Sequence, residues 1–463
     1  MGTLLKLVST LLDHLLSKTW NFVSRLSGKR VREGIALGLA VRDGKVSKDK
    51  VLLAHIRRPE HLAILGKTGV GKSYFLRSLI KQDLEARNGI VLFDIHGDLT
   101  PYVLSVVAEQ EQEQKEDLSE RVIVIDPADE EYSCGLNLLE AQPGQNVYRL
   151  ISEFTSILQN RWGKEFGPRT LEALNASLHV LSEAGQTLLE IGPLLTNPTF
   201  RAKCIKQTSN NEVKAYFLDR FNAASEAMQA SISAPVLNKI TGFTIDPKFR
   251  HLIGQAKSTF SIRDVIENNL ILIVNLAKGK LGDQALTFGS LLFAKLKSAI
   301  FARRSRRLAT LYLDEVQNLV VWDASLEVLL AECRKFNVSV VTANQYLEQL
   351  PAIIRAGLEA IGTHVYFQIS PSDAQVVAKQ SGGGKPRSEQ LQNLPHQHFL
   401  LKAGSQPFRH LHSLTIERPQ ANYRDLYERC RRRWMRERSE IESEIVMRLP
   451  AQKVFAEAIN DWE

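Results

Sequence analysis

The sequence predicts an α/β fold in which a mainly parallel sheet is interrupted by an all-helical insertion. Three observations support this: short apolar runs recur along the chain, helical stretches separate them, and one long region lacks such runs. The apolar runs are 61–65, 89–94, 121–126, 269–276, 309–314, 338–342 and 365–369. Strands that alternate with helices usually form a parallel sheet covered on both faces, so these runs are expected to share one buried sheet.

The helical insertion separates the third apolar run from the fourth. Residues 146–241 show helical periodicity and almost no strand-like run. A chain of 463 residues is long enough for two or three domains. The predicted organisation is an N-terminal amphipathic helix (1–30), a first α/β part (31–142), an all-α inserted domain (143–260), a second α/β part (261–420) and a charged C-terminal helical tail (421–463).

A glycine-rich motif follows the first apolar run and precedes a helical stretch. It consists of Gly66, Lys67, Thr68, Gly69, Val70, Gly71, Lys72 and Ser73, which is the phosphate-binding pattern G-x-x-x-x-G-K-[ST] in its required context. The glycines let successive backbone N–H groups point into one anion-sized hollow. Lys72 is expected to reach the β- and γ-phosphates, and the Ser73 hydroxyl to ligate Mg²⁺. The sequence therefore predicts a site for ATP with Mg²⁺.

Two acidic residues and an amide are the candidates for catalysis beside this loop. Asp314 and Glu315 end an apolar strand, where Asp314 would hold the Mg²⁺ shell through water and Glu315 would act as general base. Alone, such a pair is equally typical of a solvated strand end. Gln345 follows the strand 338–342, and an amide at that edge of the sheet could sense the γ-phosphate or the attacking water.

Other candidates have competing structural interpretations. Arg334 lies between Asp314–Glu315 and the next strand, so it could meet γ-phosphate charge in cis or across a subunit interface, or be a surface cation. Arg355 is a rival for the same role. Asp94 ends the second strand and could join the Mg²⁺ network, whereas His96 could be a buried hydrogen-bonded residue.

Composition constrains location and partners. The net charge of +8 makes polyanions plausible partners, and four scattered cysteines without a CxxC pair argue against a disulfide framework or a zinc site. A cytoplasmic protein is therefore expected. Residues 3–27 carry apolar side chains at helical spacing with charges between them, so we expect an amphipathic helix that packs on protein or contacts the inner face of a membrane peripherally.

The sequence also contains basic and histidine clusters. Basic residues gather at 303–307 and 429–438, where nucleic-acid contact competes with an ordinary solvated face. His396, His398, His410 and His412 form two i,i+2 pairs on adjacent expected strands, but no carboxylate or cysteine joins them as a metal ligand.

Several motifs, in this order, resemble those of one family. They are the phosphate-binding loop, Asp94-Ile95-His96-Gly97-Asp98, Ile125-Asp126-Pro127-Ala128-Asp129, residues 135–140, Leu313-Asp314-Glu315-Val316-Gln317-Asn318 and residues 342–350. Together they resemble the conjugative DNA-transfer ATPases, the type IV coupling proteins of the HerA–FtsK superfamily, over about 50–420. Ile95 and Leu138 stand where the family pattern would have proline.

The resemblance implies a RecA-like motor that works as a hexameric ring around DNA. It implies that Lys72 and Ser73 bind phosphate and metal, that Asp314 and Glu315 are the Walker B pair, and that Gln345 is the sensor. It makes Arg334 the preferred candidate for an arginine finger or a trans-acting sensor. Implied partners are DNA bound without sequence preference, further copies of the chain, and relaxase, relaxosome or secretion-channel proteins.

Three functional hypotheses follow. The first is an ATP-driven DNA translocase that serves transfer of a conjugative or mobilisable element. The second is a HerA-like translocase that partners a nuclease in DNA-end processing or phage defence. The third is an adaptor whose docking surface is assembled by ATP binding, with turnover incidental.

Overall fold

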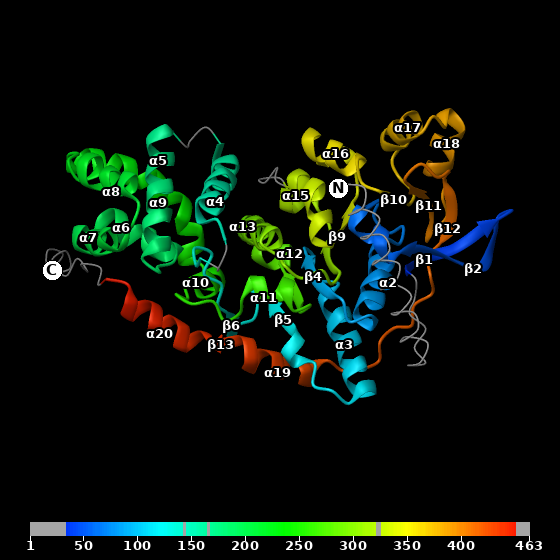
Figure 1. Ribbon diagram of the computed structural model, residues 1–463, viewed down its shortest axis with the longest axis horizontal. Coiled ribbons are helices and arrows are strands. Elements are labelled where there is room, and N and C mark those ends of the chain that lie inside the picture. Colours follow the sequence, from blue (N-terminus) through cyan, green and yellow to red (C-terminus); the bar gives the residue numbers. More distant parts are fainter. Residues whose placement is uncertain (1–33, 142–144, 164–166, 321–325, 451–463) are drawn as a thin grey trace, which may run out of the picture.

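The computed structural model describes residues 34–141, 145–163, 167–320 and 326–450, and the helix expected within residues 3–27 lies outside them. The described strands form a large sheet and a small two-stranded ribbon, and a group of helices lies at the far end from the β1–β2 hairpin (Figure 1). The large sheet contains β1 (Gly34–Arg42), β2 (Lys45–Ala54), β3 (Leu62–Leu65), β4 (Gly89–Asp94), β5 (Val122–Ile125), β7 (Ile271–Asn275), β8 (Ala309–Leu313), β9 (Val338–Asn344), β10 (Thr363–Tyr366), β11 (His398–Ala403) and β12 (Arg409–His412).

The order of the strands across this sheet is β2-β1-β12-β11-β10-β3-β9-β8-β4-β7-β5. The strands from β10 to β5 are parallel, whereas β11, β12, β1 and β2 pair antiparallel with their neighbours. Each of the seven apolar runs lies on one of the parallel strands. The predicted α/β class with a mainly parallel sheet is confirmed.

The hairpin of β1 and β2 is absent from the sequence-based prediction, which places strands only from residue 61 onward. Its turn residues, Asp43 and Gly44, have φ angles of 50° and 75°, the left-handed pair that a two-residue hairpin favours. Pairing of Leu39 with His412 joins the hairpin to the antiparallel end of the sheet. The Asp-Gly pair between two partly apolar runs is therefore the sequence feature that indicates these strands.

Helices follow the parallel strands along the chain. They are α2 (Lys72–Glu85), α3 (Thr100–Gln114), α12 (Lys278–Leu281), α13 (Asp283–Phe301), α14 (Gln317–Val320), α15 (Leu326–Glu332), α16 (Ala352–Glu359), α17 (Pro371–Gln380) and α18 (Gly384–Gln392). Phe75 of α2 is fully buried and packs edge-on against Phe367 and Phe399, with ring centroids 5.9 and 5.1 Å away. This aromatic contact fixes the first turns of α2 against the sheet.

Most of the described chain between β6 (Tyr132–Cys134) and β7 is helical, and its helices group together in Figure 1. They are α4 (Val147–Trp162), α5 (Pro168–Glu183), α6 (Ile191–Thr196), α7 (Pro198–Gln207), α8 (Asn211–Ala215), α9 (Glu226–Ile245), α10 (Pro247–Ile253) and α11 (Ile262–Glu267). Two buried lysines connect α13 to the beginning of this group of helices. Lys295 donates to the carbonyls of Asn137 and Glu140 at 2.6 and 2.9 Å, and Lys297 pairs with Glu153 of α4 at 3.0 Å. None of the described helices combines the length and apolar content that crossing a membrane requires.

The C-terminal segment differs from the single charged helical tail that the sequence predicts. It forms α19 (Arg424–Trp434) and α20 (Arg438–Arg448), separated by β13 (Met435–Glu437). The strand β13 pairs antiparallel with β6, which interrupts the helix. In Figure 1 the segment runs along one side of the molecule, from α3 past α10 toward the helical group.

Candidate active site

The glycine-rich loop occupies the turn between β3 and α2, as its sequence context predicts. Gly71 has a φ angle of 112°, which only glycine adopts readily, and it is the residue before the first turn of α2. A Cβ atom on Gly66 would lie 2.7 Å from the Cβ of Phe367, so the loop also needs glycine for close packing. Thr68, Gly69 and Ser73 are exposed, and Ser73 lies in the first turn of α2, where the helix dipole favours an anion.

The side chain of Lys72 curls back over this loop. Its Nζ donates to the carbonyl oxygens of Gly66 at 2.6 Å and Lys67 at 2.9 Å. Burial lowers the pKa of Lys72, and the nearby Glu315 and Asp314 carboxylates oppose that shift. The ammonium group is therefore held at the mouth of the loop by weak neutral acceptors that phosphate oxygens can replace.

Asp314 and Glu315 follow β8, which lies between β4 and β9, and both side chains are buried. Burial, together with the charges of Glu315 and Asp94, raises the pKa of Asp314 to about 7. Glu315 has a φ angle of 49°, a conformation that costs energy in a residue with a side chain. The site thus holds two acidic side chains close together beside Lys72.

Two amides hold the carboxylate of Glu315. Gln345 donates from Nε2 to Glu315 Oε1 at 2.8 Å, and Gln317 donates to Glu315 Oε2 at 2.5 Å. Thr68 of the glycine-rich loop donates from its hydroxyl to Gln345 Oε1 at 3.0 Å. Gln345 therefore bridges the phosphate-binding loop and the acidic pair. Sequence reasoning assigned no role to Gln317 or to this use of Thr68, although both lie inside the quoted motifs.

Asp94 lies near Asp314, but its carboxylate already accepts four hydrogen bonds. These come from the backbone N–H groups of Gly97, Leu99 and Thr100 and from the Thr100 hydroxyl, at 2.7 to 3.0 Å. Such a carboxylate has little remaining capacity to bind a cation. The geometry favours a role in shaping the turn before α3 over a role in the Mg²⁺ network. His96, the alternative buried residue of this stretch, is exposed.

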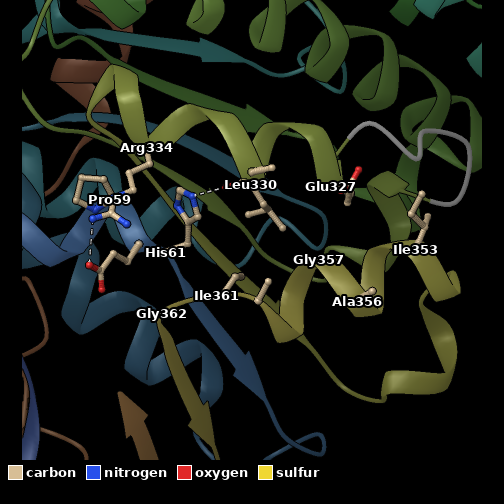
Figure 2. Close-up of a pocket in the computed structure, with 13 residues that line it drawn as sticks. Pro59, His61, Glu327, Leu330, Arg334, Ile353, Ala356, Gly357, Ile361 and Gly362 are labelled. Atoms are coloured by element: carbon tan, nitrogen blue, oxygen red, sulfur yellow. Dashed lines mark hydrogen bonds and ion pairs between the residues drawn. The ribbon is translucent and has the colours of Figure 1, made fainter. Parts of the chain in front are cut away.

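Arg334 lies at the opposite edge of the sheet from the glycine-rich loop. It precedes Val338, the first residue of β9, whereas Gln345 follows the last, and its Nη2 contacts Glu60 before β3 at 3.5 Å. The Arg334 side chain is 68% exposed and lines a cavity of about 460 Å³ together with His61, Leu330 and Ile353 (Figure 2). In this conformation, Arg334 therefore does not contact the nucleotide pocket of its own chain.

His61 forms the floor of that cavity. Its Nδ1 accepts from the N–H of Val340 at 3.1 Å, and its Nε2 donates to the carbonyl of Leu330 at 3.0 Å. Burial lowers the pKa of His61 to about 4, so the ring is neutral and acts as a structural link between β9 and α15. Arg355, the rival of Arg334, lies on α16 in a separate groove beside Asp373.

The arginines of the cluster at 429–438 mostly have partners within the chain. Arg431 pairs with Asp129 at 2.7 Å, and Arg438 is buried, where it donates to the carbonyls of Asp129 and Pro127. Arg429 pairs with Glu111, Arg433 with Glu120, and Arg436 with Glu444. These partners favour a structural role for most of the cluster, which connects α19 and α20 to Glu111, Glu120 and Asp129, and nucleic-acid contact stays a prediction.

The basic cluster at 303–307 and the histidine cluster both contain residues that bond within the chain. Arg303 is buried and donates to the carbonyls of Ile266 and Phe336. His398 and His410 share a hydrogen bond of 3.0 Å between Nδ1 and Nε2. Within the part of the chain that the structure describes, no group of three or more histidine, cysteine or acidic side chains has the arrangement of a metal site.

The fold and this site define a RecA-like P-loop protein of the ATPase class. The family model described as "Helicase HerA, central domain" matches residues 56–293, about half of the chain, and the chain belongs to this family. No curated protein sequence matches it.

Among solved structures, the chain is similar to the bacterial conjugative coupling protein TrwB and to VirB4 of Thermoanaerobacter pseudethanolicus. TrwB in complex with the ATP analogue ADPNP is 17% identical with a TM-score of 0.57, over 85% of this chain and 97% of that one. VirB4 is 18% identical with a TM-score of 0.57, over 86% and 99%. TrwB in complex with ADP and Mg²⁺ is 17% identical with a TM-score of 0.54, over 86% and 91%. These similarities show a shared fold. The family match confirms the predicted P-loop ATPase of the HerA–FtsK superfamily at the level of the HerA family.

Proposed function

We propose that this chain is an ATP-driven DNA translocase that serves transfer of a conjugative or mobilisable element. The observation that carries the proposal is the hydrogen-bonded bridge from Thr68 through Gln345 to Glu315, which links the phosphate-binding loop to the acidic pair. The TrwB structures with bound ATP analogue and with ADP and Mg²⁺ support ATP and Mg²⁺ as ligands. The HerA family match and the likeness to TrwB and VirB4 support the motor interpretation.

The residues of the pocket divide the chemistry between them. Backbone N–H groups of 66–73 and the Lys72 ammonium bind the phosphates, because Lys72 can exchange two carbonyl acceptors for charged oxygens. The Ser73 hydroxyl and the Asp314 carboxylate are hard oxygen donors that fit Mg²⁺, which neutralises phosphate charge when bound. Glu315 takes a proton from the attacking water, and Gln345 and Gln317 hold its carboxylate in position.

The position of Arg334 supports assembly into a ring. Its guanidinium is exposed at the edge of the sheet away from its own nucleotide site, and among the described residues its ion pair is a weak contact with Glu60. An arginine there can complete the site of a neighbouring copy, and a closed ring, in the family a hexamer, supplies that neighbour to every subunit. Hydrolysis would then be coupled between adjacent subunits.

DNA displacement tests the motor directly. We expect the wild-type protein with ATP to displace a third strand from triplex DNA, and DNA to stimulate its ATP hydrolysis. Lys72→Ala should lose ATP binding and both activities. Because the contacts would be to phosphates, DNA affinity should fall steeply between low and high salt. ATP hydrolysis that DNA does not stimulate, without displacement of the third strand, would contradict the proposal.

The family match favours one second candidate, a HerA-like translocase that partners a nuclease in DNA-end processing or phage defence. The two candidates share the pocket and differ in the partner. A nuclease that copurifies stoichiometrically with the chain would support this candidate, whereas a relaxase or secretion-channel protein would support conjugation.

A further inference from the structure

The cavity beside Arg334 is a groove between α15 and α16, and its apolar floor has no part in the proposed function. It has a volume of about 460 Å³, and Figure 2 shows residues of both helices along it. Four of its lining residues follow the i, i+3, i+4, i+7 spacing of one helical face: Ile353, Ala356, Gly357 and Ala360. A second face of α16, with Ile354 and Leu358, is buried in the core. Thus α16 carries apolar residues on two faces, of which one lines the α15–α16 groove.

The face of α16 that lines the groove is open to solvent. Ile353 is 51% exposed, and Ala356 is exposed as well. The two helices come close together at Gly357, since a Cβ atom there would lie 3.2 Å from Cγ of Glu327 on α15. On the α15 side, Leu330 adds an apolar wall. Covering apolar surface that spans two helices removes it from water, and an amphipathic helix laid in a groove is a common way to do so.

The charges of the groove favour a basic segment. Of its three charged lining residues, Glu60 and Glu327 are acidic and Arg334 is basic. Arg334 lies 3.5 Å from Glu60, so these two charges partly compensate each other. A segment with apolar side chains on one side and more cations than anions on the other therefore complements both the floor and the rim.

Residues 3–27 of this chain have that composition. Leucine and valine side chains recur at helical spacing, and the charged residues between them are Lys6, Lys18 and Arg25 against Asp13. The segment 28–33 that joins them to β1 adds Lys29, Arg30 and Arg32 and one acidic residue.

The first described residue lies close to the groove. Gly34, which begins β1, pairs with Ala54 at the end of β2. The next element is the 3₁₀ helix η1 (His55–Glu60), whose residues Pro59 and Glu60 line the groove. Six residues of 3₁₀ helix span about 12 Å, and the six residues 28–33 reach up to about 20 Å when extended. This tether is therefore long enough for residues 3–27 to reach the groove of their own chain.

We propose that residues 3–27 dock in the α15–α16 groove of their own chain, with their apolar side chains on the open face of α16. A segment in this groove covers Arg334, which lines the same cavity. Arg334 then cannot reach the nucleotide site of a neighbouring copy, so the docked segment inhibits ATP hydrolysis and its release permits it. This inhibition rests on the proposed function, whereas the docking itself does not.

A photocrosslinker placed in the full chain at Ile353 tests the docking. The variant Ile353→p-benzoylphenylalanine is irradiated without nucleotide, as a mixture of isotopically labelled and unlabelled chains, and the crosslinked peptides are identified by mass spectrometry. We expect crosslinks to residues 3–27 of the same chain. The matched control is the same substitution at Ile245, which is 71% exposed on α9, and it should give none.

The other crosslinking outcomes overturn the proposal. Crosslinks from position 353 that join labelled to unlabelled chains make the groove an interface between copies. Crosslinks to residues 3–27 that are equally abundant from positions 353 and 245 show that the segment has no preferred site. Crosslinks from position 353 that do not include residues 3–27 leave the groove to another occupant.

ATP hydrolysis tests the inhibition with substitutions in the segment. Leu15→Asp places a charge among the apolar side chains, whereas Ser17→Asp adds the same charge on the polar side of the expected helix. We expect Leu15→Asp to raise the rate about fivefold by releasing the segment, and Ser17→Asp to leave the rate near that of the wild type. In an Arg334→Ala background, Leu15→Asp should have no effect.

The two measurements separate the proposal from the proposed function. If Leu15→Asp and the wild type hydrolyse ATP at the same rate, the segment does not inhibit. If neither chain hydrolyses ATP, the proposed function fails, and the crosslinks, which need no nucleotide, still decide whether residues 3–27 dock.

Discussion

The two edges of the parallel sheet differ in how complete they are. At the carboxyl edge, Lys72 donates to a carbonyl of the glycine-rich loop, and Gln345 donates to the buried Glu315, whose charge lies near Lys72. At the amino edge, Arg334 is exposed beside a cavity, and within the described part of the chain its acidic partner is Glu60 at 3.5 Å. One edge therefore carries a pocket that a single chain assembles, and the other carries an exposed guanidinium that, in the proposed ring, would act on a second chain.

Arg334→Ala should reduce ATP hydrolysis by about a thousandfold while leaving ATP affinity within about twofold, because a trans arginine acts on developing charge. Arg334→Lys should recover only part of the rate, since a lysine lacks the planar guanidinium. Steady-state hydrolysis and equilibrium binding of a fluorescent ATP analogue measure the two effects.

Mixing two inactive variants shows whether Arg334 acts across an interface. A mixture of Arg334→Ala and Glu315→Gln chains contains interfaces with an intact Glu315 on one side and an intact Arg334 on the other. We expect such mixtures to regain activity that neither variant shows alone. No recovery in rings shown to contain both variants would contradict action in trans.

Gln345→Ala should lower hydrolysis by about a hundredfold at saturating ATP, because Glu315 loses one of the two amides that orient it. Thr68→Val removes the hydroxyl that holds Gln345 and should give a smaller loss in the same direction. Single-turnover hydrolysis is the measurement. If the Gln345→Ala variant hydrolysed ATP at the wild-type rate, Gln345 would not be the sensor.

The raised pKa of Asp314 predicts a pH dependence. Its carboxyl is protonated below pH 7 and cannot serve a cation well, so Mg²⁺-dependent ATP affinity should rise about tenfold between pH 6 and pH 8. Asp314→Asn should bind more weakly and lose this dependence. For folding the sign is opposite: the pKa is raised on folding, so the associated stability is present at low pH and is lost as pH rises through 7.

The paired arginines at the C-terminus should have the smallest effect on DNA. Arg429→Gln and Arg433→Gln should leave DNA affinity within about twofold, because their charges already face Glu111 and Glu120. Arg438→Gln should instead lower the melting temperature, since it strips a buried donor from the carbonyls of Asp129 and Pro127. A salt-dependent loss of DNA binding in the first two variants would support the nucleic-acid interpretation.

Local sequence patterns predict the carboxyl edge well. Apolar runs mark the parallel strands, and the glycine-rich loop and Asp314–Glu315 are recognised because their chemistry fixes their spacing. What the sequence leaves open depends on contacts between distant residues. The hydrogen-bond partners of Asp94 indicate that this carboxylate shapes a turn. Arg431 forms an ion pair with Asp129, which is distant in the sequence. The hairpin of β1 and β2 was missed although its Asp-Gly turn is a local feature.

The most direct test of the central claim is ATP turnover by the wild-type chain and by Glu315→Gln in the presence of DNA. The account predicts that the wild-type chain hydrolyses ATP and that Glu315→Gln binds ATP with similar affinity but stalls. If Glu315→Gln supported full DNA transfer, hydrolysis would be incidental, and the chain would be an adaptor whose assembly ATP binding controls.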